Sequence, residues 1–143
     1  MVLGYNAKLY IGAGFSSYSN DVPNVKDLTL EFSDDEADAT TRGSAGYKMT
    51  EPSLRGATVS FEMVYDTADT DFTTIMAAFF NRSAMFIAVA DGPIATIGTW
   101  YFKASMKVFS FQKTEALGDI QKVAITLKPC YSSNIPTTVT VSA

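Results

Sequence analysis

Residues 28–33 read Leu-Thr-Leu-Glu-Phe-Ser and residues 57–65 read Ala-Thr-Val-Ser-Phe-Glu-Met-Val-Tyr, and these two stretches decide the fold. In both, apolar side chains alternate with polar ones over most of the length. Because successive side chains of a strand point to opposite faces, this alternation predicts two half-buried β-strands. The same pattern recurs at residues 122–128, and shorter strands are expected at residues 7–11 and 85–90.

The segment between the first two strands has a mixed composition. It is acidic at residues 34–38, small and flexible at residues 40–46, and extended in character at residues 47–52. Long loops in compact domains are usually functional or disordered. We therefore expect a long loop or a hairpin arm at about residues 34–52.

A further strand at residues 100–111 changes its pattern partway. Trp100, Phe102, Ala104, Met106 and Val108 share one face and lysines occupy the other, but Phe109 and Phe111 then fall on the lysine face. Two interpretations stay open. Either the strand contains a β-bulge near Val108, or its far end is buried on both faces by a neighbouring subunit.

One segment has helical rather than strand periodicity. Between residues 69 and 82, the apolar side chains of Phe72, Ile75, Met76 and Phe79 are spaced i, i+3, i+4 and i+7. Asp66, Thr67 and Asp69 are possible N-caps, and the positive charge of Arg82 suits the C-terminal end of a helix. The pattern predicts one α-helix that covers an open side of the sheet.

These elements define the expected fold class, which is mainly β: a β-sandwich or barrel with one flanking α-helix at about residues 69–82. We find no repeat or linker and expect a single domain over residues 1–143. The segment at residues 130–143 is β-prone and poor in large side chains. It is expected to form an edge strand or a C-terminal arm donated to a neighbour.

Composition excludes several functions. The chain of 143 residues has a net charge of −4, which disfavours binding to a nucleic acid backbone. It contains no histidine, which removes histidine-based triads and metal sites, and the single cysteine, Cys130, cannot form an intrachain disulfide. The start of the chain lacks the features of a secretory signal, and the apolar runs at residues 75–80 and 84–90 are shorter than a membrane helix. We expect a soluble protein without a membrane partner.

Charge is unevenly distributed along the chain. Residues 1–99 contain thirteen acidic and six basic side chains, whereas residues 100–143 contain two acidic side chains and five lysines. Such asymmetry favours contact between subunits if the two regions lie on different faces. The alternative is a random scatter of charge over a solvated surface.

No catalytic motif is complete. The best metal candidate is the acidic run Asp34, Asp35, Glu36 and Asp38, but it lacks the spacing of a calcium loop, so a solvated acidic turn or an interface patch is the preferred interpretation. No serine lies in a G-x-S-x-G motif, and the glycines at 12 and 14 complete no phosphate-binding motif. We predict no catalytic residue, no cofactor, no metal and no enzymatic activity.

Seven segments, taken in order, resemble the major tail tube proteins of long-tailed, siphovirus-type bacteriophages. They are Gly4–Tyr10, Val25–Leu30, Glu36–Gly43, Ser60–Asp66, Ala78–Asn81, Ala88–Pro93 and Val123–Pro129. The resemblance covers most of residues 4–129, and its main weight lies in the order of the segments and in Glu36–Gly43. The fold that it implies, a β-sandwich or barrel flanked by one helix, agrees with the prediction from periodicity.

The resemblance also implies a function. Members of that family form hexameric rings that stack into a hollow tail tube, which surrounds the tape-measure protein and conducts DNA during ejection. The implied partners are further copies of the chain, the tape-measure protein, and the tail terminator and tail-tip proteins. DNA would pass through an acidic lumen without specific binding. The implied location is the tail tube of a virion assembled in the host cytoplasm.

In that family the long loop between early strands contacts the adjacent ring, and the matching positions here are residues 34–51. Within them the resemblance points to five residues at the self-assembly interface: Asp38, Arg42, Tyr47, Lys48 and Glu51. Arg42 is the most specific prediction among the five, because a guanidinium in a small, acid-flanked loop can form a bidentate pair across an interface.

Two alternatives stay open. One is the inner-tube protein of a type VI secretion system or another contractile particle, which would deliver effectors rather than DNA. The other is a monomeric ligand-binding β-sandwich, for example one that stacks carbohydrate on Trp100 and Tyr101. The position of Trp100 on an apolar face favours a core role over this second alternative.

Overall fold

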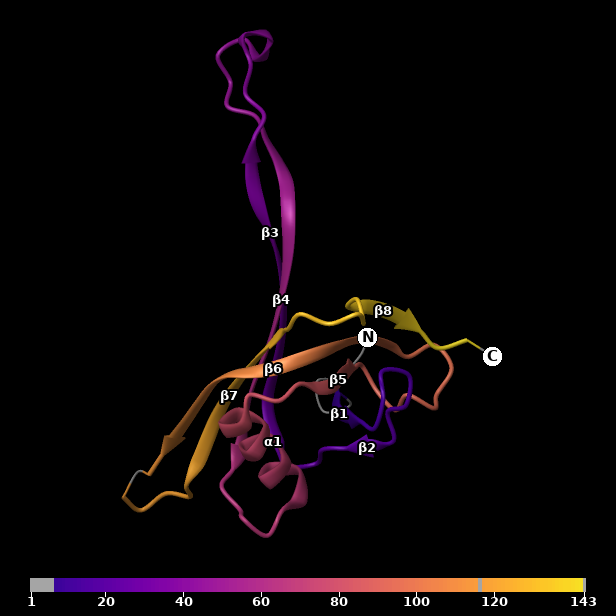
Figure 1. The fold of residues 1–143 in the computed structure, drawn as a ribbon, viewed down its shortest axis with the longest axis vertical. Coiled ribbons are helices and arrows are strands. Elements are labelled where there is room, and N and C mark those ends of the chain that lie inside the picture. The colour runs from indigo at the N-terminus through magenta and orange to yellow at the C-terminus, as the bar shows by residue number, and fades with distance from the viewer. Residues whose placement is uncertain (1–6, 116, 143) are drawn as a thin grey trace.

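The computed structural model describes residues 7–115 and 117–142, and it contains one antiparallel sheet with a single α-helix in those residues (Figure 1). The opening segment of the resemblance lies partly, at residues 4–6, outside the described residues. The elements are β1 (Lys8–Gly12), β2 (Asn20–Asp21), β3 (Val25–Asp38), the 3-10 helix η2 (Arg42–Ser44), β4 (Thr50–Val64), α1 (Thr70–Asn81), β5 (Met85–Ala90), β6 (Trp100–Thr114), β7 (Lys122–Pro129) and β8 (Thr137–Thr140). The prediction of a mainly β fold with one helix is confirmed.

The strand order β2-β1-β5-β6-β7-β4-β3 makes β6 the element that joins two halves of the sheet. The first part of β6 pairs with β5, and the part after Met106 pairs with β7. Buried side chains from both halves meet in one core, for example Leu9 and Ile87 from one half and Val59 and Ile125 from the other. The sheet therefore curls around its own apolar face, as the predicted sandwich or barrel requires.

The helix α1 forms where periodicity predicts it and is capped at both ends. The carboxylate of Asp69 accepts a hydrogen bond from the backbone N–H of Asp71 at 3.1 Å, and Arg82 ends the helix in a left-handed conformation. Phe72 and Ile75 are fully buried, so the helix covers the core with its apolar stripe.

Strand β6 contains a β-bulge, which is one of the two arrangements left open by its sequence. Its register on β7 shifts between Val108 and Ser110, so that Phe109 is the extra residue. The shift moves the following odd-numbered side chains to the core face. The ring of Phe111 stacks on Phe79 of α1, with centroids 5.6 Å apart, while the Phe109 side chain remains 58% exposed.

The C-terminal segment returns to its own sheet. Strand β8 pairs with the beginning of β6, from Trp100 opposite Thr140 to Lys103 opposite Thr137. In the described residues the segment is thus an edge strand on its own chain.

Candidate self-assembly surfaces

The most prominent surface feature is a two-stranded hairpin that projects far from the rest of the molecule (Figure 1). We call residues 31–56 the arm, since every residue in this range except Ser44 is exposed. Strand β4 pairs with β7 only from Val59 onward, so the arm beyond that point is a ribbon of two strands. An isolated two-stranded ribbon is at best marginally stable in water. Among the described residues, no third strand pairs with this part of the hairpin.

The tip of the arm is held by local hydrogen bonds. The hydroxyl of Thr40 accepts from the backbone N–H of Met49 at 2.9 Å, and the N–H of Ala39 donates to the carbonyl of Met49 at 3.0 Å. Beyond this closure, the hydroxyl of Ser44 accepts from the N–H of Thr41 at 3.1 Å. The chain then reverses through Ala45 and Gly46, which have positive φ angles of 53° and 84°. The tip is therefore a turn closed by hydrogen bonds.

The five residues predicted from the resemblance lie in this tip and just below it. Arg42 opens η2, the ring of Tyr47 is 72% exposed, and Lys48 is exposed beside it. Asp38 and Glu51 belong to facing strands at the base of the tip, where Asp38 is opposite Thr50. Among the described residues, no ion pair reaches Arg42, Lys48 or Glu51.

Asp38 stabilises the start of the tip. Its carboxylate accepts a hydrogen bond from the backbone N–H of Thr40 at 2.9 Å. Hydrogen bonding by the Thr40 hydroxyl and N–H holds the pKa of Asp38 below its ordinary value, because these donors favour the charged carboxylate.

The acidic run of β3 is spread along one strand of the arm rather than gathered into a site. Asp34 accepts a hydrogen bond from Nε of Arg55 on the facing strand at 2.9 Å, and this bond, followed by the charge of Asp34, raises the pKa of Arg55. Asp38 is engaged with Thr40, and a register shift separates Asp34 from Glu36. Within residues 7–115 and 117–142, no group of three or more acidic, cysteine or histidine side chains is arranged to hold a metal ion.

Sequence reasoning missed the apolar side chains of the arm. Leu54 is 74% exposed, and Met49 is also exposed. In the sequence such residues are indistinguishable from core residues, and only the projection of the hairpin shows that they are exposed.

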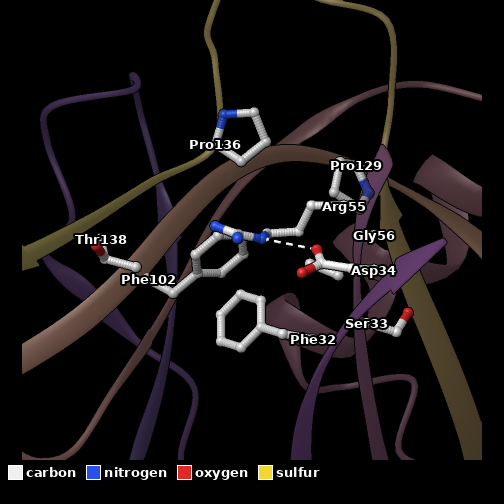
Figure 2. A pocket seen from close by; sticks show the side chains of 10 residues that line it. Phe32, Ser33, Asp34, Arg55, Gly56, Phe102, Pro129, Pro136 and Thr138 are labelled. Carbon is white, nitrogen blue, oxygen red and sulfur yellow. Dashed lines mark hydrogen bonds and ion pairs between the residues drawn. The ribbon is translucent and has the colours of Figure 1, made fainter. Parts of the chain in front are cut away.

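A groove of about 710 Å³ lies where the arm leaves the body, and we call it the basal groove (Figure 2). It runs between the arm and the C-terminal segment, with Phe32, Asp34 and Arg55 on one side and Pro136 and Thr138 on the other. Its ion pair between Asp34 and Arg55 is drawn in Figure 2.

A second groove of about 690 Å³, the aromatic groove, lies between the end of α1, the bulge of β6 and the end of β7. Its lining residues are Phe79, Phe80, Arg82, Lys107, Val108, Phe109, Pro129, Cys130 and Tyr131. Phe80, Phe109 and Tyr131 all line this groove, and all three are strongly exposed. Exposed aromatic side chains that line one groove are a common feature of interaction sites.

No protein-family model and no curated protein matches the chain by sequence. Solved structures, in contrast, match over nearly its whole length. The tail of an empty gene transfer agent (GTA) particle, refined with C6 symmetry, has a TM-score of 0.75 at 13% identity and covers 99% of this chain and 100% of that chain. The SPP1 tail tube has a TM-score of 0.74 at 10% identity, and the match covers 99% of this chain and 80% of that chain. A chain of the PVC sheath-tube complex, from an extracellular contractile injection system, has a TM-score of 0.67 at 13% identity. The match covers 99% of this chain and 93% of that chain.

The fold is therefore that of the tail and tube subunits of phage-like particles. The resemblance to tail tube proteins that the sequence suggested is confirmed at the level of the fold. In the described part of the chain, no helix is both long and apolar enough to cross a membrane.

Proposed function

We propose that this chain is the structural subunit of a tail tube, which self-assembles into rings that stack as a hollow tube. The observation that carries the proposal is the arm, a 26-residue ribbon whose side chains, apart from Ser44, are exposed in the single chain. A ribbon of this kind gains its stability from contacts with other copies. The similarity of the fold to the GTA tail and the SPP1 tail tube supports the same conclusion.

In this proposal the rings are hexameric, and the C6 symmetry of the matching GTA tail supports that number. The tip residues Asp38, Arg42, Tyr47, Lys48 and Glu51 contact the adjacent ring. The tube surrounds a tape-measure protein, ends on tail terminator and tail-tip proteins, and conducts DNA through its lumen during ejection. Its place is the virion tail, assembled in the host cytoplasm, and its role is structural rather than enzymatic.

A second candidate is the inner tube of a contractile injection particle, since the PVC complex, like the GTA tail and the SPP1 tail tube, matches over 99% of this chain. The two candidates have the same ring architecture and differ in cargo. The monomeric binding module is less favoured. Trp100 and Tyr101, its proposed stacking platform, are only partly exposed, and each packs against a buried apolar cluster.

Negative-stain electron microscopy of the purified protein across a concentration series tests the proposal. We expect rings or hollow filaments above a threshold concentration. The matched control replaces residues 39–49 by Asn-Gly, a two-residue turn suited to closing the hairpin between Asp38 and Thr50. This variant should fold, as judged by circular dichroism, and stay monomeric. Single folded subunits of the unmodified chain at every concentration would contradict the proposal.

A further inference from the structure

We propose that the aromatic groove receives the arm of a second copy of this chain. The inference rests on the proposed function, in which copies associate through the arm, and it identifies the surface on which the arm docks.

The groove exposes three aromatic side chains, those of Phe80, Phe109 and Tyr131. The ring of Phe80 is 70% exposed and lies edge-on to Phe79, with centroids 5.1 Å apart. The bulge of β6 turns Phe109 outward, and Tyr131 lies two residues after Pro129, the end of β7. Exposed aromatic side chains that line one groove are common anchors of a protein–protein interface.

Charge identifies the arm as the matching partner. Arg82 and Lys107 line the groove, and no carboxylate is found among the described residues that line it. A third cation, Nζ of Lys128, lies 5.8 Å from the ring centroid of Phe109. The arm carries six carboxylates and three cations: Glu31, Asp34, Asp35, Glu36, Asp38 and Glu51 against Arg42, Lys48 and Arg55. Complementary charge of this kind orients two surfaces and suppresses wrong pairings.

The apolar parts are complementary as well. The arm exposes Tyr47, Met49 and Leu54, whose exposed fractions are 72%, 46% and 74%. A groove of about 690 Å³ with aromatic walls can accept side chains of this size.

The basal groove is a poorer receptor for the arm. Its cation, Arg55, is already paired with Asp34 at 2.9 Å. Pro136 and Thr138 of the C-terminal segment also lie along it (Figure 2). It therefore presents no unpaired positive charge to an acidic ribbon.

An arm cannot reach the groove of its own chain. Figure 1 shows the tip of the arm at one end of the longest axis and α1 toward the other end. The contact must then join different surfaces of two copies. A heterologous contact of this kind repeats from copy to copy, closing into rings or continuing as a filament.

Cross-linking tests the proposal, because Cys130 lines the groove and is the only cysteine of the chain. Tyr47→Cys, Met49→Cys and Leu54→Cys each place one thiol on the arm. Under conditions in which particles form, we treat each variant with a thiol oxidant or a short bis-maleimide. We expect at least one to give a ladder of trimers and larger species on a denaturing non-reducing gel, since each copy then carries one arm thiol and one groove thiol.

Adding Cys130→Ser should reduce any ladder to dimers at most. Leu117→Cys is the matched control, because this exposed position lies in the β6–β7 turn rather than on the arm. Tyr131→Cys combined with Cys130→Ser provides a second, more exposed groove thiol for the same three arm positions.

Particles that give no ladder with either groove thiol would overturn the inference and leave the proposed function intact. An equal ladder from Leu117→Cys would also overturn it. If electron microscopy finds no particles of the unmodified chain, the proposed function fails, and the inference fails with it.

Discussion

The ring of Phe32 lies edge-on to the ring of Phe102, with centroids 5.1 Å apart and planes at 86°. Phe32 belongs to β3, the last strand of one half of the sheet, whereas Phe102 belongs to the part of β6 that pairs with β5. The contact joins the two halves at the point where the arm leaves the body. It therefore closes the curled sheet and anchors the arm.

Phe32→Ala should destabilise the fold by about 1–2 kcal/mol, the range for losing an aromatic pair together with partial burial of a ring. Urea denaturation followed by circular dichroism measures the change. Leu117→Ala, at an exposed position in the β6–β7 turn, is the control and should stay within about 0.5 kcal/mol of the unmodified chain. Equal stabilities of the two variants would contradict the anchoring role.

Arg42→Glu should leave the subunit folded and abolish tube formation, because it reverses a charge at the tip of the arm without touching the core. Electron microscopy and sedimentation measure the loss. Arg42→Lys keeps the charge but not the planar guanidinium, so it tests for bidentate pairing. Lys26→Glu, an exposed charge reversal outside the arm, should assemble normally. Tubes of normal length from Arg42→Glu would exclude this role for Arg42.

Phe111→Ala should destabilise the protein by about 2–4 kcal/mol, the scale for removing an aromatic side chain from a core. The bulge takes up Phe109 as the extra residue of β6, so the ring of Phe111 reaches the core face, where it stacks on Phe79. Phe109→Ala keeps the bulge and removes only an exposed ring, so its effect on unfolding should be much smaller. Equal losses of stability from the two variants, measured by urea denaturation, would contradict this assignment of faces.

The order of the arm tip should depend on pH through Asp38. Since the pKa of this carboxyl is lowered in the folded state, its stabilising effect is present above the unfolded pKa of about 4 and is lost as the pH falls through the lower folded value. Amide hydrogen exchange at Thr40, corrected for the intrinsic rate, should show weaker protection at low pH. Asp38→Asn retains an acceptor oxygen and should remove this dependence. Unchanged protection at Thr40 in Asp38→Ala would contradict the capping role.

Tyr18→Phe should stabilise the subunit by about 1 kcal/mol, because it removes a buried polar group that lacks a partner. The hydroxyl of Tyr18 is buried and has no hydrogen-bond partner among the described residues. Burial, with a smaller contribution from Tyr101, raises its pKa to about 12. The unmodified chain should therefore lose stability relative to the variant as the pH rises from about 10 toward 12. Urea denaturation at pH 7 and pH 10.5 measures both effects, with Tyr131→Phe as the exposed control.

The sequence by itself determined the elements whose pattern is local. The helix predicted at residues 69–82 is found as Thr70–Asn81 with caps at both neighbouring residues, and the strand predicted at residues 85–90 has those bounds. Alternation and helical spacing reveal which side chains share a face, and that information lies within a few residues of chain. The general position of the arm, at about residues 34–52, could be predicted from its mixed composition, which is also a local property of the chain.

Only the tertiary structure decided which segments pair and in what register. The change of pattern after Val108 fits either a bulge or burial on both faces, and the pairing of β6 with β7 selects the bulge. The ion pair between Arg55 and Asp34 follows from the register of two strands whose partners are 21 residues apart. Phe80 and Phe109 look like core residues in the sequence, and the aromatic groove emerges only when α1 and β6 are brought together. Periodicity records which faces are apolar, but contacts between distant segments decide whether an apolar face is covered by the chain itself or left for another copy.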